Sequence, residues 1–177
     1  MRIVAGEWGG RRIRTPAGDA TRPTTDRVRE AWMSILAPRL SGARVLDLFA
    51  GSGALGLEAL SRGAAEAVFV EKNPRALGVL RDNIAQLAAG PRARVVPGDV
   101  RAFLDHLEPT AHFHIALADP PYEQGWATRL LEQFQQKPFA RELWVEHRTG
   151  EPIPALPGLA QRRYGDTTLS NLSEETE

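Results

Sequence analysis

Residues 45–56 read VLDLFAGSGALG. The first five positions are apolar except for Asp47, which is typical of a strand buried on both faces of a parallel sheet. The G-x-G-x-x-G spacing that begins at Gly51 allows the backbone to turn tightly and to come close to a ligand. This stretch therefore predicts a buried strand over 45–49, a ligand-binding turn, and a helix from about Leu55.

Working outward, the chain alternates between short apolar runs and helical patterns. The dipeptide Asn73-Pro74 is typical of a helix start, and the apolar stripe of the helix that follows runs from Leu77 to Leu87. Further strands are expected at 67–70, 94–96, 113–118 and 142–146, and further helices around 103–107 and 126–134. Five such alternations predict a doubly wound α/β sheet with right-handed crossovers. A closing antiparallel pair, 160–164 with 167–172, makes this a mixed sheet of seven strands.

The N-terminal residues show a different pattern. Residues 1–15 predict a β-hairpin around the glycine-rich turn 6–10, and residues 15–23 are typical of a linker. A helix is expected to begin at Thr24 or Thr25 and to end at Pro38. We therefore expect an N-terminal hairpin and linker extension over 1–23, and a single α/β domain over 24–177.

Charge is distributed unevenly along the chain. The 177 residues carry no net charge, yet residues 1–44 hold nine arginines against four acids. This basic front end suggests an anionic partner. The absence of cysteine excludes disulfides, thiolate nucleophiles and cysteine-based zinc sites. No apolar run approaches the roughly 18 residues of a membrane span, so a soluble cytoplasmic protein is expected.

Acidic residues follow the predicted strands where ligands of such sheets bind. Glu71 follows the second strand and can accept both hydroxyls of a ribose. Asp99 follows the third strand and can reach an adenine amino group. Either acid can instead cap the next helix, and Asp47 can be a buried, hydrogen-bonded carboxylate. Three acids at three consecutive strand ends nevertheless predict a ligand that contains adenosine.

Asp47 also separates two candidate cofactors. A dinucleotide places its pyrophosphate at this turn, where an acid is an awkward neighbour. S-adenosylmethionine has no phosphate and carries a sulfonium and an ammonium, which an acidic strand end can serve through charge-assisted hydrogen bonds. The sequence therefore favours S-adenosylmethionine.

The fourth strand ends in Asp119-Pro120-Pro121-Tyr122. Here the chain resembles the amino-methyltransferases that use S-adenosylmethionine, whose signature for exocyclic amines of nucleobases is Asp-Pro-Pro-Tyr. An aromatic amine is a poor nucleophile because its lone pair is delocalised into the ring. Asp119 and the Pro120 carbonyl can each accept a hydrogen bond from one N–H group of the amine. The two prolines fix the backbone, and Tyr122 can stack on the base.

Three further segments narrow the resemblance: RPTTDRVRE at 22–30, LFAGSGALGLEALSRG at 48–63, and YGDT at 164–167. Together they resemble the bacterial methyltransferases that modify guanine N2 in 16S ribosomal RNA. The resemblance implies a Rossmann-like class I methyltransferase fold and a substrate in the small ribosomal subunit. We expect a monomer that needs no metal.

The expected site residues fall into three groups. The catalytic group is Asp119, Pro120, Pro121 and Tyr122. The cofactor group is Asp47, Phe49, Ala50, Gly51, Ser52, Gly53, Glu71, Lys72, Asn73, Asp99 and Val100. The group for the RNA substrate is Trp8, Arg11, Arg12, Arg14, Arg22, Thr24, Thr25 and Arg27. In the last group the arginines would contact phosphates and Trp8 would be available for stacking. The alternative is a solvated surface with Trp8 packed on the domain.

Three other functions compete with this one. An adenine-N6 methyltransferase of DNA uses the same motif, but such enzymes usually carry a separate target-recognition domain, for which 177 residues leave no space. A nicotinamide-dependent oxidoreductase has no use for Asp-Pro-Pro-Tyr. An RNA-binding assembly factor that lost the chemistry would not need Asp119 and Glu71.

Overall fold

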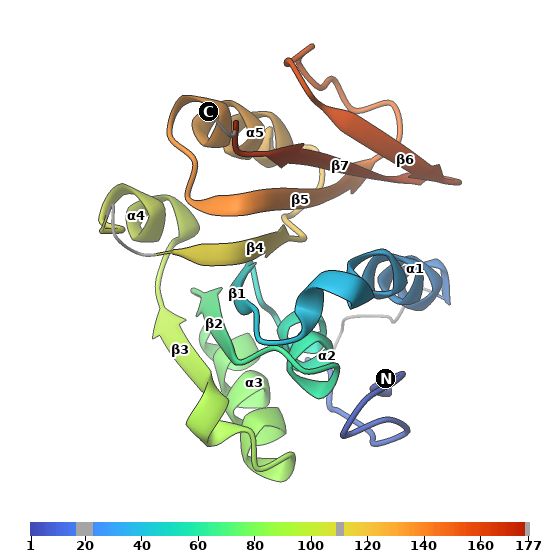
Figure 1. Ribbon diagram of the computed structural model, residues 1–177. Helices are drawn as coiled ribbons and strands as arrows, with labels where there is room; N and C mark the ends of the chain where they lie inside the picture. The colour runs from blue at the N-terminus through green and yellow to red at the C-terminus, as the bar shows by residue number, and fades with distance from the viewer. Residues whose placement is uncertain (17–22, 109–111, 176–177) are drawn as a thin grey trace.

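The computed structural model describes residues 1–16, 23–108 and 112–175, with the side chains of residues 23–25 left aside. Seven strands form one mixed sheet in the order β3-β2-β1-β4-β5-β7-β6 (Figure 1). In chain order the strands are β1 (Arg44–Leu48), β2 (Glu66–Glu71), β3 (Ala93–Pro97), β4 (Phe113–Ala118), β5 (Ala140–Arg148), β6 (Ala160–Tyr164) and β7 (Thr167–Ser173). This confirms the predicted mixed, doubly wound α/β sheet.

The strand β1 lies near the centre of the sheet, between β2 and β4, and is parallel to both. Its residues from Val45 to Leu48 are buried, because helices cover both faces of the sheet. The carboxyl ends of β1, β2, β3 and β4 meet at one edge. The turns that follow these four strands therefore come together in space.

Helices on the two faces give the molecule two apolar clusters. The cluster on one face joins the helices α1 (Pro23–Leu40), α2 (Ala54–Ser61) and α3 (Pro74–Gln86). The cluster on the other face joins α4 (Val100–Asp105) and α5 (Trp126–Gln136). A short 3-10 helix, η1 (Gly90–Arg92), precedes β3. Alternate residues of β1 belong to different clusters, Val45 to the first and Leu46 to the second, as the alternation of a strand requires.

The boundaries of α1 differ from the prediction. The helix begins at Pro23, before Thr24, and continues through Pro38 to Leu40. Proline removes one helical hydrogen bond, here the bond to the carbonyl of Ser34. Both Ser34 and Pro38 lie on the exposed side of the helix, so water can satisfy that carbonyl and the helix runs on for two residues.

Residues 1–14, which we call the N-terminal segment, fold back on themselves without forming regular strands. One isolated antiparallel bridge joins Arg2 to Arg12, supported by the bonds from Ile3 N to Arg11 O (2.9 Å) and from Gly10 N to Ile3 O (2.8 Å). The side chains of Ile3, Trp8 and Ile13 are buried in the cluster with α1, α2 and α3. The predicted hairpin path is therefore present, but it is held by packing on the domain.

At the opposite end of the chain, β6 and β7 form a regular antiparallel pair. The strand β7 also pairs antiparallel with β5 over seven residue pairs, from Glu142 with Ser173 to Arg148 with Thr167. It is largely buried, whereas β6 forms an exposed edge of the sheet. This pair closes the sheet on the side of β5 that faces away from β4.

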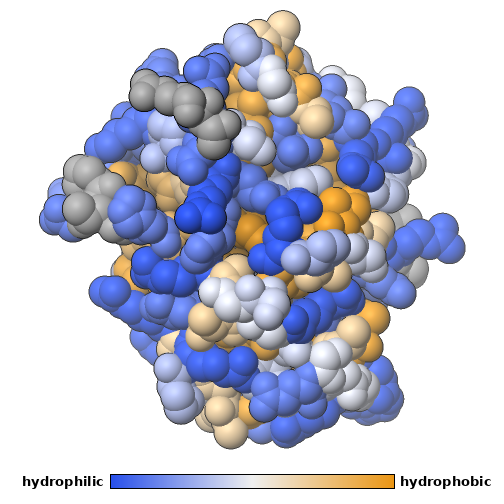
Figure 2. All heavy atoms as spheres, in the orientation of Figure 1, coloured by the Kyte–Doolittle hydropathy of each residue, from blue (hydrophilic) through white to orange (hydrophobic). Residues whose placement is uncertain are grey.

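The surface is largely polar. Figure 2 shows hydrophilic side chains over most of the visible face, with hydrophobic ones in smaller patches between them. Among the described residues, Val4 is the large hydrophobic side chain that is exposed. Across the described ranges, no helix combines the length and the apolar character needed to cross a bilayer.

Candidate active site

A cavity of about 780 Å³ lies at the carboxyl ends of β1, β2, β3 and β4. The turns after these four strands line it, at residues 49–52, 71–73, 98–100 and 119–122. The structure thus brings together the predicted cofactor residues and the predicted catalytic motif. Of the expected cofactor group, Asp47 and Gly53 are not among the residues that line the cavity.

The turn after β1 has an unusual backbone. Phe49 has a φ of 58°, in the left-handed region that side chains other than glycine rarely adopt. Its ring packs edge-on against Trp126, with ring centroids 4.9 Å apart. This contact holds Phe49 in a strained backbone conformation at the first residue of the turn that lines the cavity. Such strained residues are common at functional sites.

The last glycine of the G-x-G-x-x-G motif serves packing. A Cβ atom on Gly56 would collide with the ring of Phe69 and lie 3.1 Å from Oδ2 of Asp47. Without a side chain here, α2 lies close against β2 and begins directly at the turn. The last glycine of the motif therefore shapes the cavity indirectly, through the packing of α2 on β2 beneath the turn.

Asp47 supports the same turn from within the protein. The residue is 1% exposed, and its Oδ2 accepts a hydrogen bond from the backbone N of Gly56 at 3.0 Å. Burial raises the pKa of Asp47 well above its ordinary value, the bond from Gly56 lowers it, and the charges of Asp119 and Glu71 raise it further. Asp47 is thus the buried, hydrogen-bonded carboxylate that the sequence left as an alternative.

Glu71 joins two of the turns. Its Oε1 accepts a hydrogen bond from Gly51 N at 2.8 Å, and its Oε2 accepts from Lys72 N at 2.8 Å and Asn73 N at 2.9 Å. A carboxylate has about four acceptor positions. Three backbone donors leave capacity for a ligand hydroxyl at the cavity wall.

Asp99 and Asn73 both cap helices and line the cavity. Asp99 accepts a hydrogen bond from Ala102 N at 3.1 Å at the start of α4. Asn73 accepts from Arg75 N at 2.9 Å and Ala76 N at 3.2 Å at the start of α3. The capping alternative therefore holds for Asp99, and it is compatible with a ligand contact because the residue also faces the cavity.

The side chain of Tyr122 is held by two strands that lie late in the chain. Its hydroxyl donates to Oε1 of Glu146 on β5 at 3.1 Å, and Oγ1 of Thr167 on β7 lies 3.5 Å away. Burial raises the pKa of Tyr122 to about 12; the Thr167 bond lowers it and the charges of Glu146 and Asp119 raise it. The phenol is therefore neutral at physiological pH and remains a donor.

Comparisons with known proteins agree with this geometry. A family model described as conserved hypothetical protein 95 matches residues 1–172. Ribosomal RNA small subunit methyltransferase D of Escherichia coli (strain K12) is 39% identical over 160 residues, which cover 89% of this chain and 79% of that protein. The protein of the same name from Haemophilus influenzae is 34% identical over 158 residues, with 86% and 81% covered.

The chain belongs to the ribosomal RNA small subunit methyltransferase D family. A solved structure described as "Putative methyltransferase yhhF from Escherichia coli" superposes with a TM-score of 0.84 at 35% identity, covering 100% of this chain and 99% of that one. The fold is that of the class I methyltransferases, and the protein is a methyltransferase.

Trp126, Glu146 and Thr167 belong to this site but were not among the site residues that the sequence predicted. Trp126 lines the cavity at the start of α5, and the guanidinium of Arg129 lies 4.3 Å from its ring centroid. Glu146 also lines the cavity, and Thr167 lies behind Tyr122. Glu146 is an acid near the end of a predicted strand, so the signal that identified Glu71 was present there too.

The N-terminal part of the enzyme also forms cavity wall. Met1, Thr15, Pro16 and Arg29 line the cavity beside the predicted residues. Arg29 is 6% exposed and donates to the backbone O of Arg2 at 2.9 Å. The N-terminal segment is thus part of the site's architecture.

The expected RNA contacts are placed unequally. Trp8 is 5% exposed and carries the guanidinium of Arg92 5.0 Å from its ring centroid, so it packs on the domain, and its ring is not presented for base stacking. Arg11 and Arg14 are exposed but engaged, with Gln86 O at 2.8 Å and Asp82 at 3.0 Å respectively. Two further arginines, Arg12 and Arg27, are exposed. Arg22 and the side chains of Thr24 and Thr25 lie outside the described residues.

Proposed function

We propose that this methyltransferase transfers the methyl group of S-adenosylmethionine to the exocyclic N2 amine of a guanine in 16S ribosomal RNA of the small subunit. The observation that carries the proposal is the position of Asp119-Pro120-Pro121-Tyr122 in the same cavity as Glu71 and the turn after β1, residues 49–52, which we call the glycine turn. A methyl donor bound at the glycine turn and a methyl acceptor bound at Asp119 would therefore lie next to each other. The names of the relatives support ribosomal RNA as the substrate, and a ribosomal substrate places the activity in the cytoplasm.

The charges of the cavity support the cofactor. Asp119 and Glu71 line the cavity and lie near enough to Asp47 for their charges to raise its pKa, so three acidic groups gather at this edge of the sheet. A sulfonium and an ammonium would relieve that repulsion. In this proposal Glu71 binds the ribose and Asp99 binds the adenine. S-adenosylmethionine supplies an electrophilic methyl group whose leaving sulfur becomes neutral.

The chain's own contribution is to position and polarise the amine. The carboxylate of Asp119 and the carbonyl of Pro120 each accept a hydrogen bond from one N–H group of the amine. These two bonds direct the nitrogen lone pair toward the methyl group. In-line displacement then depends on alignment and exclusion of water. The proton that the amine releases can pass to the carboxylate of Asp119.

Tyr122 provides the stacking surface for the base. Its ring is held by the hydroxyl bond to Glu146 and by Arg148, whose guanidinium lies 5.6 Å from the ring centroid. Arg148 is itself paired with Glu123 at 2.8 Å. A ring fixed in this way loses little entropy when a base stacks on it.

The test is a methylation assay with three substrates: unmodified small subunits, naked 16S RNA, and DNA. The enzyme is incubated with radiolabelled S-adenosylmethionine and the labelled nucleoside is identified after digestion. We expect N2-methylguanosine from RNA. Label on N6-methyladenine, or no label on any substrate, would overturn the proposal. An Asp119→Ala variant serves as the inactive control.

A further inference from the structure

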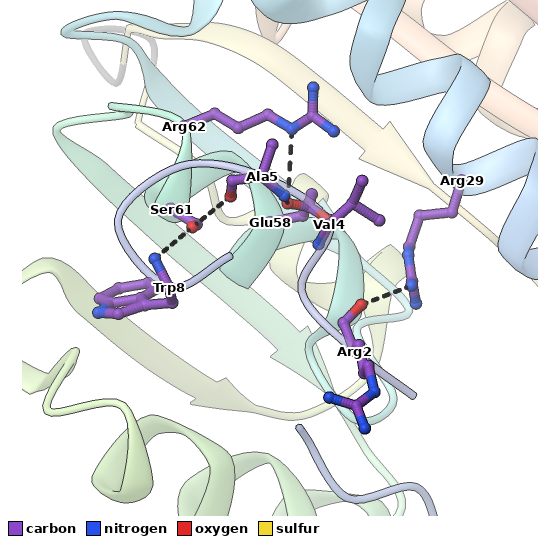
Figure 3. Close-up of polar contacts among 8 residues, drawn as sticks. All are labelled: Arg2, Val4, Ala5, Trp8, Arg29, Glu58, Ser61 and Arg62. Carbon is purple, nitrogen blue, oxygen red and sulfur yellow. Dashed lines mark hydrogen bonds and ion pairs between the residues drawn. The ribbon is translucent and has the colours of Figure 1, made fainter. Parts of the chain in front are cut away.

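Buried polar side chains of the domain hold the N-terminal segment in place. Figure 3 shows Glu58 and Ser61 of α2 beneath the backbone of the segment. Glu58 accepts from Val4 N at 2.8 Å, and Ser61 accepts from Trp8 N at 2.9 Å and donates to Ala5 O at 2.6 Å. These contacts satisfy backbone groups that a regular sheet would have paired.

Asn83 of α3 completes this arrangement at the end of the segment. The residue is 0% exposed. Its Oδ1 accepts from Arg14 N at 2.8 Å, and its Nδ2 donates both to Arg14 O at 2.9 Å and to Ser52 O at 2.9 Å. Both amide hydrogens of the side chain are therefore used, one on the N-terminal segment and one on the glycine turn.

One of the two groups that Asn83 joins lines the cavity, and the other directly precedes residues that do. Ser52 lines it, and Arg14 is followed by Thr15 and Pro16, which also line it. These wall residues are more than 35 positions apart in the sequence. One buried amide thus sets the position of the glycine turn relative to the wall that the N-terminal residues supply.

We propose that Asn83 is a positioning residue for the cofactor site. Its bond to the Ser52 carbonyl holds the glycine turn in the conformation that binds the cofactor, and its paired bonds to Arg14 tie that conformation to the docked N-terminal segment. Loss of the side chain weakens cofactor binding by more than its effect on folding explains. This inference rests on S-adenosylmethionine as the cofactor.

Ser61 provides a matched control. It is also buried, at 4% exposure, and it also bonds to the backbone of the N-terminal segment. Its contacts reach Ala5 and Trp8, which do not line the cavity. A Ser61→Ala variant therefore loosens the same segment without removing a bond to the glycine turn.

The experiment measures the dissociation constant of S-adenosylhomocysteine by calorimetry for the wild type, Asn83→Ala and Ser61→Ala. We expect about 10-fold weaker binding for Asn83→Ala, in line with the loss of one or two buried hydrogen bonds, and a change within about 2-fold for Ser61→Ala. In turnover assays Asn83→Ala should raise the KM for S-adenosylmethionine and leave kcat near the wild-type value. Hydrogen exchange of the Gly51 and Gly53 amides should also accelerate.

Other outcomes separate the two proposals. Equal weakening by Asn83→Ala and Ser61→Ala, or wild-type affinity in Asn83→Ala, would overturn the role of Asn83. Failure of the wild type to bind S-adenosylhomocysteine would instead remove the proposed cofactor. If Asn83→Ala does not fold, Asn83→Asp carries the test, because it keeps the acceptor for Arg14 N and loses both Nδ2 donors, the one to Arg14 O and the one to Ser52 O.

Discussion

The two halves of the cavity are built in different ways. In the cofactor half, Glu71, Asn73 and Asp99 bond to backbone N–H groups within a few residues of themselves or in the neighbouring turn. In the substrate half, Tyr122 is held by Glu146 and Thr167, which lie 24 and 45 residues further along. The first half is local and formed by helix starts, whereas the second depends on the complete sheet.

This difference predicts that mutations in the two halves affect separate kinetic quantities. Cofactor-half changes should alter affinity for S-adenosylmethionine, because in the proposed function these groups bind parts of the cofactor that do not react. Substrate-half changes should alter the rate of transfer, because in the proposed function these groups contact the amine and its base. The following predictions test the division, beginning with the largest effect.

Asp119→Ala should reduce the rate of methyl transfer about 1000-fold, the scale seen when a preorganised group at the reacting centre is removed. The dissociation constant for S-adenosylhomocysteine should change by less than about 2-fold. Single-turnover assays with small subunits measure the first quantity and calorimetry the second. Parallel losses in both would place Asp119 in the cofactor half.

Glu71→Gln should weaken cofactor binding by about 10- to 100-fold, since hydrogen bonds to a charged group are worth about 1.5–3 kcal/mol. The kcat at saturating cofactor should stay near the wild-type value. Glu66→Gln is the control, because Glu66 lies at the opposite end of β2 and pairs with Arg44. A fall in kcat for Glu71→Gln with an unchanged KM for S-adenosylmethionine would contradict the assignment of Glu71 to the cofactor half.

Tyr122→Phe should slow transfer by about 2- to 10-fold, because it removes one hydrogen bond to Glu146 and keeps the stacking ring. Tyr122→Ala should slow it further, since the ring itself is lost. The readout is the single-turnover rate with small subunits. Equal rates for the two variants would assign the contribution of Tyr122 to its hydroxyl alone.

Asp47→Asn should have the smallest effect among the four predictions. We expect it to change how the free energy of unfolding depends on pH. Burial raises the pKa of Asp47 above its ordinary 3.8, so the folded protein holds this proton more tightly than the unfolded chain does. The free energy of unfolding therefore falls as pH rises from about 4 through the folded-state pKa. Asparagine carries no titratable proton, so it removes this slope, and the wild type should lose stability relative to Asp47→Asn as the pH rises. Urea unfolding at several pH values measures it; parallel curves for both proteins would contradict it.

The cofactor half was largely predictable from the sequence because its signals are local. The apolar run of β1 and the acids directly after β2 and β3 are neighbours in the chain, and parallel strands bring their ends together. The functional roles of these residues stay predictions, as does the division of the chain at residue 23. What the pattern at Asp47 did not reveal is that its carboxylate faces Gly56.

The substrate half and the N-terminal segment were less accessible. The Asp119-Pro120-Pro121-Tyr122 motif was evident, but its supports Glu146 and Thr167 come from antiparallel strands whose register no local pattern fixes. Trp8 stands among glycines and charged residues, which favours an exposed turn. Its burial results from docking on Ser61 and Arg92, so only the tertiary structure reveals it.

The side-chain attachment of residues 1–14 has a consequence for how the protein folds. These residues are synthesised first, yet the groups that hold them, Glu58, Ser61 and Asn83, follow 44 to 69 positions after Arg14. Such contacts of high sequence separation form late, because a long loop must close before they contribute. Ile3, Trp8 and Ile13 therefore stay in water until α2 and α3 exist, and this part of the cavity wall is completed only after those two helices have formed.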